Sequence, residues 1–244
     1  MTTLGQDTGT AGKQTRRSDA GVLQITQRDI DGLVLCAEHQ GLPYDLLGSA
    51  LRTSEPAVRK LVRRWQRAGY AAHARLGPGP WWCWLTKEGM SATGLGYPTG
   101  RPGLGRIEHI RAVLAARLWL SNGPVWEQGM AWWQSERRIR SGRPRNATGH
   151  VPDAEIHWPS IEGSPYAGQV WAIEVELTPK RVTRTTAIMT ELLTPMRYAS
   201  VVYLTAPAAH RVVTSAAARL GTADRARLAI RGLPENALVP ESAR

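Results

Sequence analysis

Residues 53–69 read TSEPAVRKLVRRWQRAG and predict a helix with two unlike sides. Ser54, Glu55 and Pro56 form a helix start signal, and Gly69 is a stop signal. Apolar residues recur at helical spacing along one side: Val58, Leu61, Val62, Trp65 and Ala68. Basic residues occupy the other side: Arg59, Lys60, Arg63, Arg64 and Arg67.

Two helices are predicted before this segment and two strands after it. Apolar spacing after Thr26, a candidate N-cap, predicts a first helix that ends near Gly41, and Pro43 opens a short second helix. Residues 70–76 and 81–85 read as strands around a Gly-Pro-Gly-Pro turn. Three helices and a hairpin predict a winged helix-turn-helix, whose third helix enters the major groove of DNA. The competing interpretation is a charged helix face that is simply solvated.

Charge favours nucleic acid as the partner. The 244 residues include 31 basic and 20 acidic side chains, and 27 of the basic ones are Arg, whose fork-shaped cation suits phosphate. A GC-rich genome also enriches Arg, but it does not explain why residues 149–244 are nearly neutral, with 10 basic and 9 acidic groups. An apolar content of 42% excludes a wholly disordered chain.

Neither a membrane span nor a cysteine framework is expected. No apolar run approaches the roughly 20 residues that a bilayer span needs, and the N-terminus lacks the apolar core of a signal peptide, so we expect a cytoplasmic protein. Cys36 and Cys83 lie far apart, and we expect both to be small core residues.

Residues 91–106 are rich in Gly and Pro and mark a domain boundary. A second basic loop over residues 141–149 contains Arg143 and Arg145, which either follow a DNA phosphate backbone or form ordinary surface. The predicted organisation is a flexible arm (1–24), a winged helix (25–95), a linker (96–106) and an α/β domain (107–244).

The last third of the chain predicts mixed α/β structure. Residues 154–158 and 169–177 read as strands that a short turn pairs in antiparallel fashion. Apolar patterning then predicts a helix, a strand and a helix over residues 182–193, 200–205 and 208–220. Helices packed on a small sheet are the expected architecture.

Three carboxylates gather in this predicted hairpin. Asp153 follows Pro152 at the start of one strand, and Glu174 and Glu176 stand two apart in the other, so they share a face. Carboxylates at such close spacing beside apolar residues repel one another unless a cation or a proton compensates. Hard oxygen donors suit Mg²⁺ or Mn²⁺, which can activate water for attack on a phosphodiester. The alternative is a half-exposed strand whose glutamates face solvent.

These residues resemble a nuclease signature. Pro152-Asp153, Glu174-Val175-Glu176 and Lys180 look like a variant of the PD-(D/E)xK motif, in which hairpin carboxylates bind metal and a lysine assists. With the predicted winged helix and the segments 132–137 and 173–180, the chain also resembles the replication-relaxation family of actinobacterial mobile elements. That resemblance implies a restriction-endonuclease-like fold and a relaxase-like role in plasmid conjugation or replication.

The resemblance also implies roles for single residues. Asp153 matches the first acid, Glu174 the second acid, and Glu136 the acid on the first helix of this fold. Glu176 stands where the signature has lysine. Three explanations remain open: the ammonium of Lys180 takes that place, Glu176 adds a metal ligand, or the site is an inactive nuclease that serves as a DNA-binding scaffold.

The sequence therefore predicts a DNA endonuclease that nicks one strand with Mg²⁺ or Mn²⁺. Its partners would be double-stranded DNA and single-stranded DNA at the nick, with a homodimer as one option for assembly. Five tryptophans could stack on such unpaired bases, although core packing is the expected role of each: Trp81, Trp82, Trp84, Trp132 and Trp133. The alternative is a non-catalytic DNA-binding regulator or accessory factor, with a degenerate nuclease-like domain.

Overall fold

The computed structural model describes residues 25–122 and 131–238, so the arm predicted for residues 1–24 lies outside the described part. The N-terminal half contains the predicted three helices and hairpin, together with two elements that were not predicted, β1 and α4. Its elements are α1 (Gln27–His39), β1 (Leu42–Pro43), α2 (Tyr44–Ala50), α3 (Glu55–Arg67), β2 (Ala71–Arg75), β3 (Trp81–Leu85) and α4 (Lys87–Ala92). The strands form an antiparallel sheet in the order β1-β3-β2.

The contact between α1 and α3 explains how this half folds. Thr26 caps α1 in a capping box with Asp29, as expected from its position. The fully buried Trp65 of α3 donates its indole N–H to Asp29 at 2.8 Å. A Cβ atom at Gly32 would come within 2.7 Å of the Trp65 ring, so only glycine lets the two helices approach this closely.

The C-terminal half is a second mixed α/β unit. It consists of η1 (Leu104–Arg106), α5 (Ile107–Ser121), β4 (Trp132–Ser135), α7 (Glu136–Gly142), β5 (Ala154–His157), β6 (Val170–Glu176), α8 (Val182–Leu192), β7 (Ser200–Thr205), α9 (Pro207–Ala217), α10 (Thr222–Ala226), β8 (Leu228–Gly232) and η2 (Glu235–Ala237). The predicted β5–β6 pair is confirmed as antiparallel, with Ala154 opposite Ile173. The predictions of α8, β7 and α9 are confirmed within a few residues, whereas β4, α10 and β8 were not predicted.

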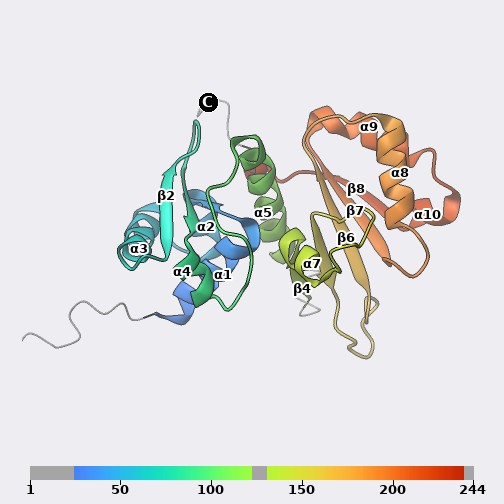
Figure 1. Ribbon diagram of the computed structural model, residues 1–244. Coiled ribbons are helices and arrows are strands. Elements are labelled where there is room, and N and C mark those ends of the chain that lie inside the picture. The colour runs from blue at the N-terminus through green and yellow to red at the C-terminus, as the bar shows by residue number, and fades with distance from the viewer. Residues whose placement is uncertain (1–24, 123–130, 239–244) are drawn as a thin grey trace, which may run out of the picture.

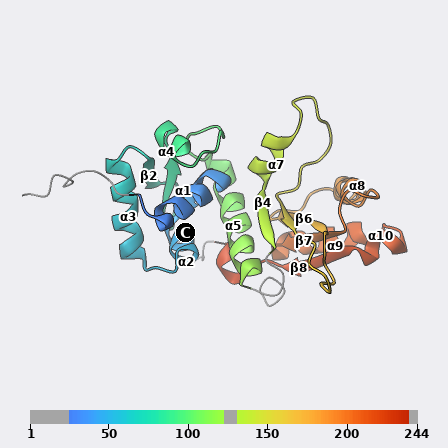
Figure 2. The same cartoon turned by 90° about the horizontal axis from the view of Figure 1, so that it is seen from below.

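Five strands form the larger sheet in the order β4-β5-β6-β7-β8. β4, β5 and β6 are antiparallel, and β6, β7 and β8 are parallel. Helices α8, α9 and α10 lie on one side of this sheet, and α5 and α7 lie on the side toward the N-terminal half (Figure 1). Seen from below, α5 again stands between the two halves (Figure 2).

The two halves share one hydrophobic core. Buried residues of α1 and α3, such as Leu33 and Val62, belong to the same cluster as Leu114 of α5 and Ile173 of β6. A separate cluster packs α8 and α9 against the sheet. α5 therefore joins both halves, and the domain boundary at residues 96–106 stays a prediction.

An ion pair reinforces this junction. Arg111 of α5, of which 4% is exposed, donates two hydrogen bonds to the carboxylate of Asp45 in α2, at 2.6 and 3.0 Å. Arg117 of α5 forms a second pair with Glu38 of α1 at 2.5 Å. Part of the positive charge in this region therefore serves the fold.

The two cysteines belong to the core of the protein. Cys36 and Cys83 are both free and fully buried, which confirms that they are core residues. Within residues 25–122 and 131–238, no helix has the length and apolar character needed to cross a bilayer.

Candidate functional site

The predicted acids come together at one end of the β5–β6 hairpin. Asp153 directly precedes β5, and its Oδ2 accepts a hydrogen bond at 2.8 Å from the backbone N–H of Val175 in β6. Val175 separates Glu174 from Glu176, so this bond holds Asp153 beside both glutamates. The charge of Asp153 and that of Glu176 both contribute to the raised pKa of Glu174, as expected for neighbouring carboxylates.

The glutamates of β6 are buried. Only 3% of Glu174 and 4% of Glu176 is exposed, because β6 is covered on both faces. The alternative in which both face solvent is therefore wrong. Burial raises the pKa of Glu174 to about 7, and the charges of Asp153 and Glu176 add to this effect against the hydrogen bond with His150. A carboxyl group with such a pKa can take up or release its proton near neutral pH.

Each acid has a basic partner. His150 contacts Glu174 through Nε2 at 2.7 Å, and Lys180 contacts Glu176 through Nζ at 2.5 Å. The third partner, His109 of α5, contacts Oδ1 of Asp153 at 2.8 Å. The site therefore combines three carboxylates with two imidazoles and one ammonium group.

The two imidazoles bind protons more tightly than usual. The hydrogen bond with Glu174 is the main cause that raises the pKa of His150, and it outweighs burial. Burial lowers the pKa of His109, but the hydrogen bond and charge of Asp153, with the charge of Glu136, outweigh it and raise the pKa overall. Both rings are thus suited to carry the charge that offsets the acids.

A buried hydroxyl group without a partner lies beside the glutamates. Tyr203 of β7 stands opposite Glu174 in the parallel register. Its phenol oxygen is buried and has no hydrogen-bond partner among the described residues. Burial, followed by the charges of Glu174, Glu176 and Asp153, raises its pKa. Tyr203 therefore adds a buried phenol group to the surroundings of the two glutamates.

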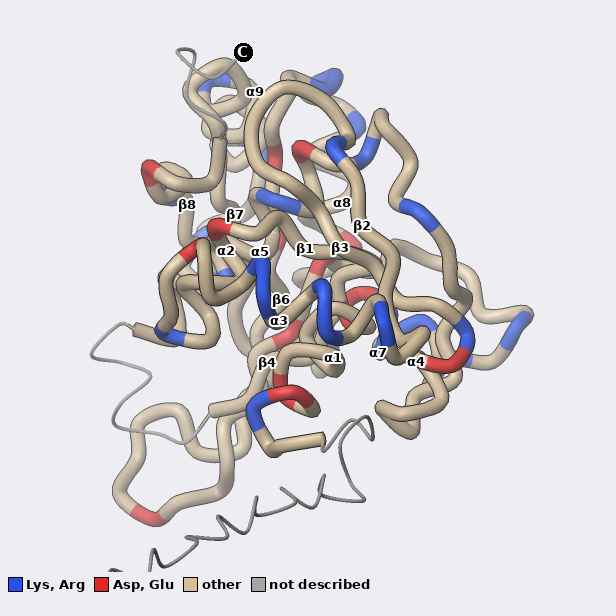
Figure 3. The backbone as a smooth tube through the Cα atoms, turned by 90° about the vertical axis from the view of Figure 1, so that its left-hand side faces the viewer, with Lys and Arg blue, Asp and Glu red and all other residues tan. Residues whose placement is uncertain are grey.

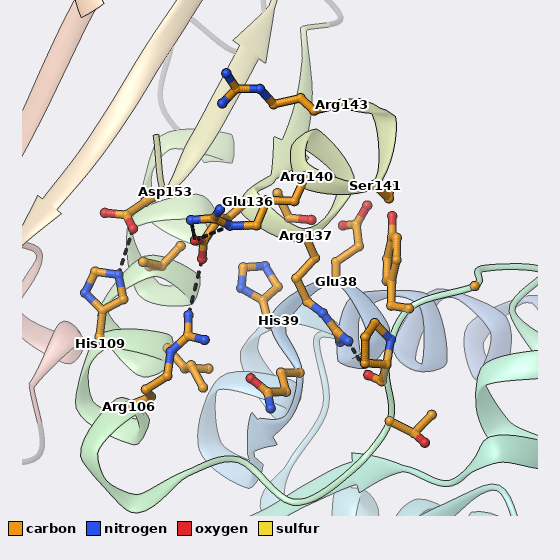
Figure 4. Close-up of a pocket in the computed structure, with 18 of the residues that line it drawn as sticks. Glu38, His39, Arg106, His109, Glu136, Arg137, Arg140, Ser141, Arg143 and Asp153 are labelled. Atoms are coloured by element: carbon orange, nitrogen blue, oxygen red, sulfur yellow. Dashed lines mark hydrogen bonds and ion pairs between the residues drawn. The ribbon is translucent and has the colours of Figure 1, made fainter. Parts of the chain in front are cut away.

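Glu136 reaches the same end of the hairpin from α7. Ser135 caps this helix, and the backbone N–H of Glu136 donates to the carbonyl oxygen of Asp153 at 3.0 Å. The Glu136 carboxylate lies between Arg106 and Arg140, at 3.3 and 2.7 Å (Figure 4). The backbone of Glu136 is therefore close to that of Asp153, while its carboxylate forms ion pairs with Arg106 and Arg140.

Asp153 and Glu136 line a cleft of about 680 Å³ between the two halves of the chain. Its walls come from the end of α1, residues 96–99, the start of α5, and α7 with the loop that follows it. Five arginines border it: Arg106, Arg137, Arg140, Arg143 and Arg145. The structure therefore brings the predicted Arg143 and Arg145 to the same cleft as Asp153, whereas Glu174 and Glu176 lie outside its lining.

The predicted basic face of α3 is mostly available. Arg59, Lys60, Arg63 and Arg67 are exposed. Helix α3, which carries them, lies on the side of the molecule that faces the viewer in Figure 3. Arg64 differs, because its guanidinium pairs with the buried carboxylate of Asp29. Arg64 thus fastens α3 to α1.

The tryptophans divide between core and surface. Trp65, Trp82 and Trp133 are buried, as expected for packing residues. Trp132 is 50% exposed and stacks on His157, with ring centroids 5.1 Å apart. Core packing was the wrong expectation for Trp132, because alternation along β4 turns it away from the buried Trp133.

His109 is the residue of the acid cluster that the sequence does not indicate. It is 44 positions away from Asp153 on another element, so no local spacing connects the two. The position of His150, three residues before Asp153, suggests a base or a phosphate-orienting group, although a loop histidine is more often incidental; the structure places it against Glu174. Within the described ranges, no set of three or more His, Cys, Asp or Glu side chains is arranged to hold a metal ion.

Comparison with known proteins yields no relative: no protein-family model and no curated protein matches this chain.

Proposed function

We propose that this protein binds duplex DNA and cleaves one of its strands with the help of Mg²⁺ or Mn²⁺ held by Asp153 and Glu174. The observation that carries the proposal is the burial of Glu174 beside Asp153, which raises the pKa of Glu174 to about 7. Burying two neighbouring carboxyl groups destabilises the folded protein, and strongly shifted pKa values of this kind cluster at functional sites. The resemblance to the replication-relaxation family makes plasmid or integrative-element DNA the proposed substrate.

The proposed DNA-binding module is a winged helix-turn-helix formed by residues 25–95. Its support is the order of three helices and a hairpin, with β1 as the third strand of a small sheet. Four exposed basic residues on α3 would meet phosphates and base edges: Arg59, Lys60, Arg63 and Arg67. The proposed catalytic module is restriction-endonuclease-like, and the hairpin that carries Asp153 and Glu174 supports it.

The donor chemistry of the site fits a small hard cation. Asp153, directly before β5, and Glu174, in the neighbouring strand β6, offer carboxylate oxygens, and the phenol of Tyr203 lies beside them without a partner among the described residues. A metal ion at this position would polarise the phosphodiester and activate a water molecule. His150 would then leave Glu174, and Glu176 would keep Lys180 beside the acids.

The cleft provides a place for the cleaved strand. Arg143 and Arg145 line the same cleft as Asp153, and guanidinium groups suit phosphate oxygens. Glu136 holds Arg106 and Arg140 at its wall, so its role is to position these two cations. The strand would enter between the two halves of the molecule, where Asp153 faces the cleft.

The second candidate is a non-catalytic DNA-binding regulator or accessory factor. The observation in its favour is that each acid already has a basic partner: His109, His150 or Lys180. In that case the acid cluster is a buried ion-pair network, and Glu176 marks a nuclease site that has lost its lysine. Both candidates share the DNA-binding module, so the metal separates them.

A plasmid-nicking assay tests the proposal. Wild-type protein should convert supercoiled plasmid with its cognate origin to the nicked form in Mn²⁺, and chelator should stop the reaction. Asp153→Asn and Glu174→Gln should abolish nicking and keep duplex binding. Glu162→Gln, an exposed change in the β5–β6 turn, is the matched control.

Calorimetry with Mn²⁺ completes the test. Binding to wild-type protein and loss of binding in Asp153→Asn would support the proposed metal site. Unchanged nicking in both variants would remove the site assignment. Absence of Mn²⁺ binding to free and DNA-bound protein would leave the non-catalytic alternative.

A further inference from the structure

A second, much smaller pocket lies where α3 meets the hairpin of the N-terminal half. Its volume is about 60 Å³, and residues from four elements line it: Tyr44 of α2, Arg59 and Arg63 of α3, His73 of β2 and Trp81 of β3. None of these residues belongs to the acid cluster or to the large cleft. The pocket therefore requires its own explanation.

His73 is held in a defined orientation in this pocket. Its Nδ1 lies 2.7 Å from the phenol oxygen of Tyr44, and its ring lies parallel to that of Tyr44, with centroids 6.2 Å apart and planes at 6°. The centroid of the Trp81 ring lies 5.3 Å from that of His73, with the two planes tilted by 33°. Such contacts with two aromatic rings and a hydrogen bond leave the imidazole little rotational freedom.

The hydrogen bond with Tyr44 also sets the tautomer of His73. Tyr44 is 2% exposed, and burial raises its pKa, so the phenol keeps its proton. Nδ1 of His73 is the acceptor that the described residues offer to this proton. Burial and the charge of Arg63 lower the pKa of His73, so the ring is neutral at pH 7 and carries its one proton on Nε2. Nε2–H is then a fixed hydrogen-bond donor.

Two guanidinium groups complete the lining. Arg59 and Arg63 are four residues apart and lie one turn from each other on the exposed face of α3. Arg63 has no ion-pair or hydrogen-bond partner in the described part of the chain. Arg59 pairs with Glu55 at 2.6 Å, but both side chains are about half exposed, and exposed pairs of this kind are weak. Both cations are thus available to an anion.

The chemistry of the lining selects the ligand. Two guanidinium groups and an imidazole N–H donor favour an anion with several acceptor oxygens. A phosphate group has this chemistry. We propose that this pocket binds one backbone phosphate of duplex DNA, with Arg63 and the Nε2–H group of His73 as its donors.

This inference rests on the DNA-binding part of the proposed function and adds His73, Tyr44 and Trp81 to it. A phosphate in this position contacts α3 and the hairpin at once. Phosphate contacts fix the register and orientation of a protein on the duplex. Tyr44 and Trp81 would act as positioning residues, because they hold the His73 ring.

Anisotropy titrations with a labelled duplex oligonucleotide, in chelator and over a series of NaCl concentrations, test the proposal without cleavage. His73→Asn places an amide near the position of Nδ1 and so keeps a partner for Tyr44, but it removes the Nε2–H donor. His73→Gln places its amide near Nε2 and keeps a donor there. Arg63→Ala removes one cation, and Arg219→Ala, an exposed change beyond the end of α9, is its charge-matched control.

We expect Arg63→Ala to weaken binding and to reduce the slope of log K against log[salt] by about one unit. His73→Asn should weaken binding roughly tenfold with an unchanged slope, because it removes an uncharged donor to a charged acceptor. His73→Gln should restore most of the affinity, and Arg219→Ala should match wild type. Thermal unfolding of each variant shows whether it is folded; if His73→Asn does not fold, the Arg63→Ala slope decides.

Two outcomes overturn the inference alone: a wild-type slope for Arg63→Ala, or equal affinities of folded His73→Asn and wild type, in a protein that still binds and nicks DNA. If the wild-type protein does not bind duplex DNA, the proposed function fails together with the inference. If the protein binds duplex DNA but does not nick it, only the cleavage part of the proposed function is contradicted. The two proposals can therefore fail separately.

Discussion

The carboxylate of Asp153 accepts a hydrogen bond at 2.8 Å from the backbone N–H of Val175. Val175 lies between Glu174 and Glu176, so the first acid is tied to the backbone that carries the other two. The second oxygen of Asp153 contacts His109 of α5 at 2.8 Å. One side chain thus connects α5, β5 and β6, and the geometry of the acid cluster depends on the fold of the whole C-terminal half.

Glu174→Gln should stabilise the protein at high pH. The pKa of Glu174 rises from 4.5 to about 7 on folding, so the folded state binds more protons and stability falls as pH rises through this interval. Glutamine cannot ionise and avoids this loss, which is on the order of 3 kcal/mol for such a shift. We expect Glu174→Gln to raise Tm by several degrees at pH 8, as measured by calorimetry.

The rise in Tm of Glu174→Gln should shrink or reverse at pH 5. Wild-type Glu174 holds its proton there, and His150 of the variant is charged without its carboxylate partner. Glu162→Gln should leave Tm unchanged at both pH values. If Glu174→Gln lowers Tm equally at pH 5 and pH 8, the ionisation of Glu174 does not destabilise the folded protein, and its pKa is not raised by burial.

Asp29 should have the opposite pH dependence. Burial raises its pKa, but hydrogen bonds from the backbone and hydroxyl of Thr26, then from Trp65 and Arg64, outweigh burial and lower the pKa below 3.8. Its contribution is therefore complete above pH 3.8 and is lost as pH falls through the folded-state pKa. Asp29→Asn should cost about 2 kcal/mol at pH 7 in urea unfolding.

The loss in Asp29→Asn should diminish as pH falls through the lowered pKa of Asp29, because wild-type Asp29 is then protonated too. Asp31→Asn is the control, since Asp31 is exposed and its bond to Gln27 lies at the surface. An equal loss in both variants would contradict a special role for Asp29.

The pair between Arg111 and Asp45 should respond unequally to the removal of either partner. Arg111 is 4% exposed, whereas 41% of the Asp45 side chain is exposed. Asp45→Ala leaves the buried guanidinium of Arg111 without its partner, which should lower the free energy of unfolding by about 3 kcal/mol or more. Arg111→Met keeps an apolar stem of similar length and leaves a carboxylate that water can reach, so it should cost about 1 kcal/mol. Urea unfolding of both variants measures the difference, and a larger loss in Arg111→Met would reverse this account.

The elements with strong periodicity could be predicted from the sequence. The apolar side of α3 and the run of β6 gave both type and place, because helical and strand periods are local properties. β8 was missed because its five residues are only partly buried or exposed, so no apolar pattern marks it. Its partner β7 lies more than 20 residues earlier, and that pairing is visible only in the fold.

The acids of the site and Lys180 could be predicted, but the contact between His109 and Asp153 could not. Glu174 and Glu176 follow the strand period, whereas His109 meets Asp153 through the packing of α5. Arg64 shares helical spacing with the exposed cations of α3, and only the position of α1 diverts it to Asp29. Tertiary packing therefore decides which charged residues remain available to a ligand.

Arg143→Ala and Arg145→Ala should weaken substrate binding in the cleft. Arg143 donates one hydrogen bond to the carbonyl oxygen of Thr148 and keeps its other N–H groups for a phosphate. Arg145 has no ion-pair or hydrogen-bond partner among the described residues, so its whole guanidinium group is available to a phosphate. A contact made equally in the bound and transition states affects KM and leaves kcat unchanged. We expect each variant to raise KM for nicking roughly tenfold at constant kcat, since a charge-assisted hydrogen bond is lost. Arg211→Ala, an exposed change on α9, should leave both constants unchanged, whereas a fall in kcat for Arg145→Ala would place this residue in the chemical step instead.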